Sequence, residues 1–128
     1  LHAPLKLQPR YFPVAGDDAA RLIIAVALHD GADAAMKIAD AVLRAVWVEE
    51  RNLADEATLA SLLRERELPA RRLEEAHSQA VQERYEANTQ RAIDAGVFGA
   101  PFFVVDGEPF WGNDRKAQIE RWLAQGPF

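Results

Sequence analysis

The stretch that decides the fold is GVFGAPFFVVDGEPFWGNDR, residues 96–115. Within it, residues 102–105 form an aromatic and β-branched run, Asp106-Gly107 suits a two-residue turn with positive φ, and residues 108–111 provide a return strand. These features predict a β-hairpin in which Val105 faces Glu108 and Phe103 faces Phe110. At the open end of the hairpin, the segment that enters the first strand and the segment that leaves the second should therefore lie side by side.

A helix should follow the hairpin. Asn113 or Asp114 is a good N-cap, and Gly126-Pro127 ends the apolar pattern that follows it. A helix N-terminus presents unpaired N–H groups and a partial positive charge, so it can receive a carboxylate, while Asp114 can receive an ammonium group. This corner suits the zwitterionic head group of an α-amino acid.

Pro101 closes the loop before the first strand, and the hairpin register places it opposite Gly112. A cis bond at Ala100-Pro101 would turn the Ala100 backbone outward and leave its N–H and C=O free to pair with an extended ligand. Glutathione has both a γ-glutamyl head and a peptide backbone, so it fits the corner and this backbone edge together. On spacing alone, the alternative is a proline that ends a loop and an Asn-Asp pair that caps a helix.

Three motifs carry a family resemblance. The run NTQRAIDA at 88–95, the GVFGAP that follows it and FWGNDR at 110–115 resemble the C-terminal part of the 2-hydroxychromene-2-carboxylate isomerases. These enzymes belong with the kappa-class glutathione transferases and the DsbA-type oxidoreductases. The similarity extends to PLKLQPRYFP at 4–13 and WVEE at 47–50. The resemblance implies an α/β, thioredoxin-like fold interrupted by an inserted all-helical domain.

The same resemblance implies roles for four residues. Pro101 matches the family's cis-proline, and Ala100 matches the residue whose backbone pairs with the cysteinyl part of glutathione. Asp114 matches the acid that holds the γ-glutamyl group, and Asn113 stands where kappa-class enzymes usually have serine. The family's catalytic serine and its first strand-helix-strand unit should precede Leu1, so we expect a mostly helical C-terminal portion with no catalytic residue of its own.

The implied activity is glutathione-dependent cis-trans isomerisation of a small aromatic substrate in aromatic, naphthalene-like catabolism. In that chemistry a thiolate adds to a conjugated double bond, the adduct rotates, and elimination restores the thiol. A kappa-like glutathione transferase is the first alternative, and a DsbA-type disulfide oxidoreductase is the second. A non-catalytic helical interaction module is the alternative of another class. Family members are typically dimeric, so the resemblance allows a homodimer, but no exposed stripe in this sequence identifies an interface.

The order of elements predicts a helical unit attached to a fragment of a sheet. We expect an entry loop at 1–16, the inserted helical domain at 17–88, and the C-terminal part of the thioredoxin-like domain at 89–128. Helices are expected at 17–29, at 33–50, in a short segment that begins at Asp55, at 69–87 and at 88–95. The second should bury a stripe of apolar residues, namely Met36, Ala39, Val42, Leu43, Val46 and Trp47. The third, capped by Asp55, should bury Leu59, Leu62 and Leu63.

Composition excludes several function classes. The chain has 128 residues, 49% apolar content and a net charge of −5, which disfavours a nucleic-acid surface. The longest apolar run, residues 22–28, is too short to span a membrane. With no cysteine there is no disulfide framework or cysteine redox motif in these residues, which fits the cytoplasm.

The remaining candidates for chemistry have ordinary explanations. Ser61 and Ser78 lie in polar helical patterns and are not expected to be nucleophiles. The three histidines share no metal-ligand spacing, so no metal site is expected. Acidic pairs such as Glu49-Glu50 and Glu74-Glu75 alternate with arginines, and exposed ion pairs on helices explain them.

Overall fold

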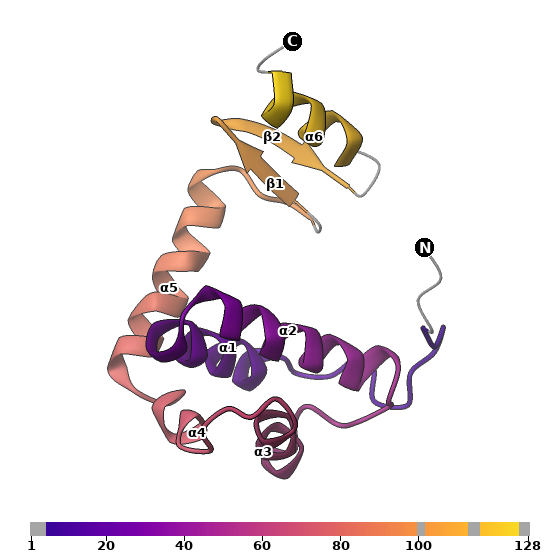
Figure 1. The fold of residues 1–128 in the computed structure, drawn as a ribbon, viewed down its shortest axis with the longest axis vertical. Helices are drawn as coiled ribbons and strands as arrows, with labels where there is room; N and C mark the ends of the chain where they lie inside the picture. The colour runs from indigo at the N-terminus through magenta and orange to yellow at the C-terminus, as the bar shows by residue number, and fades with distance from the viewer. Residues whose placement is uncertain (1–4, 100–101, 113–115, 126–128) are drawn as a thin grey trace. The chain divides into compact units, whose positions relative to one another are not determined.

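The computed structural model describes residues 5–99, 102–112 and 116–125 (Figure 1). The chain divides into two compact units, Leu1–Glu86 and Ala87–Phe128, and each is described by itself. The elements, in chain order, are α1 (Asp17–Asp30), α2 (Ala32–Trp47), α3 (Glu56–Glu65), α4 (Arg72–Glu75), α5 (Gln79–Asp94), β1 (Phe102–Val105), β2 (Glu108–Trp111) and α6 (Lys116–Gln125).

The first helix, α1, begins at residue 17 as predicted, but neither Asp17 nor Asp18, the aspartates suited to cap it, is its N-cap. Its N-cap is Gly16, and no side chain caps the helix. Asp17 and Asp18 lie instead in the first turn, where negative charge is favourable because of the helix dipole. The helix ends at Asp30, and Gly31, with φ of 92°, separates it from α2. A positive φ costs glycine little, which explains the sharp change of direction here.

The buried face of α2 corrects the predicted stripe. Met36 and Leu43 are 70% and 61% exposed. The helix has apolar residues on two sides, and its smaller and β-branched residues form the face that packs against α1 and α3. That face consists of Ile38, Ala41, Val42, Ala45 and Val46. The helix also ends at Trp47, three residues before the predicted boundary.

The third helix, α3, confirms both the predicted cap at Asp55 and the predicted burial of three leucines. The Asp55 side chain accepts a hydrogen bond from the backbone N–H of Ala57 at 3.1 Å, which is N-cap geometry. Leu59, Leu62 and Leu63 are all buried. Together with α1, α2 and Leu53 they form the main hydrophobic core, and Trp47 packs against its edge.

The predicted helices at 69–87 and 88–95 are wrong in their boundaries. The chain forms the single turn α4, breaks, and then forms α5 without interruption from Gln79 to Asp94. At the break, the Ser78 hydroxyl accepts a hydrogen bond from the backbone N–H of Val81 at 3.3 Å and so starts α5. Asn88 and Thr89 lie inside α5 and do not cap a new helix.

The second unit contains the predicted hairpin. Its register pairs Val105 with Glu108 and Phe103 with Phe110, as expected. Asp106 and Gly107 have φ of 51° and 80°, the conformation that matches a two-residue turn to twisted strands. Figure 1 shows α6 beside the hairpin, and Phe110 of β2 and Ile119 of α6 are both buried.

Candidate functional site

The open end of the hairpin is the candidate site. The ladder ends with Phe102 paired to Trp111, so the chain enters β1 and leaves β2 side by side. Paired residues in an antiparallel ladder have Cα atoms about 4.5–5.5 Å apart. Gly112 follows with φ of 100°. The described segments that flank the predicted site therefore lie side by side, as expected for the predicted hairpin.

The four predicted site residues lie outside the described residues. Ala100 and Pro101 come directly before β1, and Asn113 and Asp114 come between Gly112 and α6. The predicted cis bond at Ala100-Pro101 and the predicted cap of α6 therefore stay predictions. In the described part of the chain, a cis peptide bond occurs at Phe12-Pro13.

The start of α6 has the electrostatic character expected of an anion site. The helix is 10 residues long and has no acidic residue in its first turn. The first N–H groups of a helix lack partners within it and carry a partial positive charge. No acid within this first turn offsets that charge, and the nearest acid before it in the sequence, Asp114, is the one predicted to bind an ammonium group.

The two serines have structural partners. Ser61, on α3, accepts a hydrogen bond from the Arg64 guanidinium at 3.1 Å, and Ser78 starts α5. A nucleophilic serine needs a histidine or carboxylate nearby to act as its base, and the hydrogen-bond partners of these two serines are instead an arginine and a backbone N–H. Within the described ranges, no group of three histidine or acidic residues could hold a metal ion.

One perturbed pKa belongs to an ion pair that joins α1 to α4. The Arg72 guanidinium donates hydrogen bonds to both carboxylate oxygens of Asp30, at 2.7 and 2.8 Å. These bonds, and the charge of Arg72, lower the pKa of the Asp30 carboxyl. Arg72 also binds Glu75, and the Glu75 carboxylate lies 2.9 Å from His29 Nε2. Arg72 is only 4% exposed, so one of the expected surface ion pairs is in fact buried.

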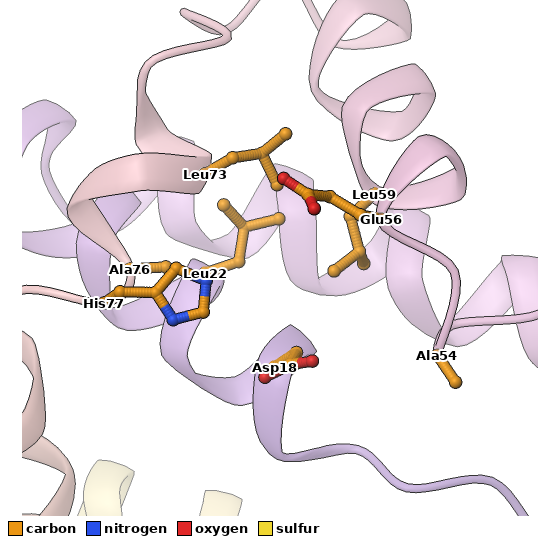
Figure 2. A pocket seen from close by; sticks show the side chains of 8 residues that line it. All are labelled: Asp18, Leu22, Ala54, Glu56, Leu59, Leu73, Ala76 and His77. Atoms are coloured by element: carbon orange, nitrogen blue, oxygen red, sulfur yellow. The ribbon is translucent and has the colours of Figure 1, made fainter.

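A hollow of about 210 Å³ lies in the helical unit between α1, α3 and α4 (Figure 2). Leu22, Leu59 and Leu73 provide apolar lining, and Asp18 and Glu56 provide carboxylates. Both acids lie in the first turns of their helices, where they stabilise the helix ends. Sequence reasoning did not find this hollow, because its residues come from three separated segments with no common spacing.

Comparison with known proteins identifies the family. The model of the DSBA-like thioredoxin domain matches residues 2–124, so this chain belongs to the DSBA-like thioredoxin domain family. The thioredoxin-like fold class predicted from the sequence is thereby confirmed. In the described part of the chain, no helix combines the length and apolar character needed to cross a membrane.

Individual relatives show which members of the family this chain is similar to. A 2-hydroxychromene-2-carboxylate isomerase from Pseudomonas sp. (strain C18) is 40% identical over 50 residues, which cover 39% of this chain and 24% of the relative. One from Sphingobium xenophagum is 46% identical over 46 residues, covering 36% and 24%. A solved 2-hydroxychromene-2-carboxylate isomerase is 28% identical with a TM-score of 0.74, covering 95% of this chain and 58% of that one. The matches thus span about a quarter of the curated relatives.

Proposed function

We propose that this chain is part of an isomerase that acts on an aromatic carboxylate and binds glutathione at the open end of the hairpin. The observation that carries the proposal is the register that pairs Phe102 with Trp111 and so joins the two flanks of the site. The named isomerase activity of the relatives supports the reaction class.

Each predicted residue has a proposed part in holding glutathione. The backbone of Ala100, ahead of Pro101, would pair with the cysteinyl part as a strand pairs with an edge. Asp114 would hold the γ-glutamyl ammonium, and Asn113 with the start of α6 would receive the γ-glutamyl carboxylate. Glutathione, when bound, supplies a thiol that can add reversibly to a conjugated double bond.

These residues would contribute to the reaction by holding the glutathione thiol in position. A thiol and a double bond held within reach react as one molecule rather than as two, which is worth several kcal/mol of the barrier. The hairpin is suited to this task because its cross-strand bonds and two-residue turn restrict the flanking backbone. Residues that hold both ends of glutathione also limit how far its thiol can move.

Glutathione binding to the full chain, measured by titration calorimetry, tests the site. Asp114→Ala should weaken binding by about tenfold, the scale expected for losing one charge-assisted hydrogen bond. Glu120→Ala, which removes an exposed acid of α6, is the matched control and should bind as the wild type does. Equal affinities for the two variants would contradict the assignment of Asp114.

Turnover tests the reaction. The protein to assay is the whole isomerase of which this chain is proposed to be a part. With 2-hydroxychromene-2-carboxylate as substrate, absorbance should then show isomerisation that depends on added glutathione. A stable conjugate would instead identify a transferase, and exchange of thiols for disulfides would identify an oxidoreductase. If the protein neither bound glutathione nor changed the substrate, the interaction-module alternative would replace the enzyme.

A further inference from the structure

A second hollow lies within the C-terminal unit, and its described lining shares no residue with the glutathione site proposed above. Its volume is about 290 Å³, and its lining comes from the end of α5, the turn after it and β1. Every lining residue belongs to the unit Ala87–Phe128. The lining residues are Asn88, Arg91, Ala92, Ala95, Val97 and Val104.

One side of this hollow is apolar. Ala92 and Ala95 are small and allow close approach to the helix, while Val97 and Val104 are 38% and 49% exposed. A cavity of about 150 Å³ is enough to hold benzene. The hollow therefore has room for a single substituted ring, and covering the two valines would remove apolar surface from water.

The other side carries a cation, Arg91, that has no ion-pair partner among the described residues. Among the described residues, Arg91 and Asn88 have no ion pair or side-chain hydrogen bond. The acid that could pair with Arg91 along the helix, Asp94, instead accepts a hydrogen bond of 2.8 Å from Gln90. By contrast, Arg51 and Arg72 are each bound to two acids.

The chemistry of these groups defines a ligand class. A guanidinium presents a planar fork of donors that matches the two oxygens of a carboxylate. The Asn88 amide, one turn earlier on α5, can donate or accept a further hydrogen bond. We propose that this hollow binds a small planar carboxylate, with its carboxylate on Arg91 and its ring against Ala92, Ala95 and the two valines.

A purely structural role for Arg91 makes different predictions. Arg91 lies in the last turn of α5, where a positive charge stabilises the helix end. In that case its replacement would change stability and leave ligand affinity unaltered. The proposed site instead requires that affinity falls while the fold is kept.

Benzoate is the probe, and NMR titration of the isotope-labelled full chain is the measurement. Saturable shifts should appear at the amides of Ala92, Ala95 and Val104. Benzamide, which has the ring without the charge, and acetate, which has the charge without the ring, should each bind at least about tenfold more weakly. Benzamide binding as tightly as benzoate would overturn the role of Arg91, and acetate doing so would overturn the role of the apolar wall.

Two variants complete the test. Arg91→Gln should weaken benzoate binding by about tenfold, and Arg91→Lys should recover only part of it because a lysine lacks the planar fork. Arg84→Gln, another exposed arginine of α5, is the matched control and should have no effect. Equal effects of Arg91→Gln and Arg84→Gln, or no saturation by benzoate, would overturn the proposal. Because the titration needs neither glutathione nor turnover, its outcome is independent of the proposed isomerase activity.

Discussion

Replacing Arg72 with methionine should strongly destabilise the helical unit. The guanidinium joins the end of α1 to α4, since it binds Asp30 through two donors and Glu75 through a third, at distances of 2.7–3.0 Å. Methionine fills much of the space of the arginine stem but donates no hydrogen bond. Arg72→Met therefore leaves Asp30 and Glu75 without the cation between them.

The size of the effect follows from burial. Removing one partner of a fully buried ion pair costs about 3–5 kcal/mol, because the other charge stays buried without compensation. Here the side chains of Asp30 and Glu75 are 21% and 25% exposed, so water can replace part of what is lost. We expect the free energy of unfolding to fall by about 2–3 kcal/mol, between the cost of a hydrogen bond to a charged group and that of a buried pair.

Urea unfolding at neutral pH, followed by the helical circular dichroism signal, measures this loss. The neighbouring Arg71 is the matched control, because its side chain is 71% exposed and lies 3.6 Å from Glu75. Arg71→Met should cost less than about 0.5 kcal/mol. If the two variants lost the same small amount, the Arg72 cluster would not stabilise the fold as argued.

The pH dependence of stability tests the pairing of Arg72 with Asp30 in a second way. Hydrogen bonds from Arg72 lower the pKa of the folded Asp30 carboxyl below its ordinary value. Such a group contributes stability above the unfolded pKa of about 3.9, and this contribution is lost as pH falls through the folded pKa. The stability difference between wild type and Arg72→Met should therefore shrink from pH 7 toward pH 2. A difference that stays constant over this range would rule out pairing with the carboxylate as its source.

Three further outcomes are expected. Ile38→Ala should lower the free energy of unfolding in urea by about 2–4 kcal/mol, since Ile38 is fully buried, whereas Leu43→Ala on the exposed side should cost under about 0.5 kcal/mol; the reverse order would restore the originally predicted stripe. Gly107→Ala should destabilise the hairpin by about 1 kcal/mol because of its positive φ, and unchanged amide exchange in the hairpin would contradict this. The hydrogen bond of 3.0 Å from the Tyr85 hydroxyl to Asp17, with the charge of that acid, raises the pKa of the phenol. In Asp17→Asn, ultraviolet absorbance should therefore show Tyr85 losing its proton at lower pH, and an unchanged titration would exclude that cause.

The features that could be predicted from the sequence are those set by neighbouring residues. Asp106-Gly107 fixes both the turn and the register of the hairpin, because two positive φ values are needed and this pair accepts them. Asp55 signals the start of α3 in the same local way, through its own side-chain hydrogen bond. Family motifs around residues 96–115 added the fold class, which the matched family model confirms.

The features that were missed depend on contacts between distant parts of the chain. Apolar residues lie on two sides of α2, and only packing against α1 and α3 decides which side is buried. Arg72 and Asp30 are 42 residues apart, so their contact has no sequence spacing to reveal it. The hollow at Arg91 likewise joins a helix end to a strand. The proposed glutathione residues rest on motif resemblance and on the described backbone that flanks them.

The most direct test of the glutathione site is an NMR titration of the full chain with glutathione. We expect saturable shifts at the amides of Phe102, Gly112 and Lys116, the described residues that flank both halves of the site, and little change in the helical unit. Shifts confined to residues of the helical unit, or the absence of any saturable shift, would contradict it.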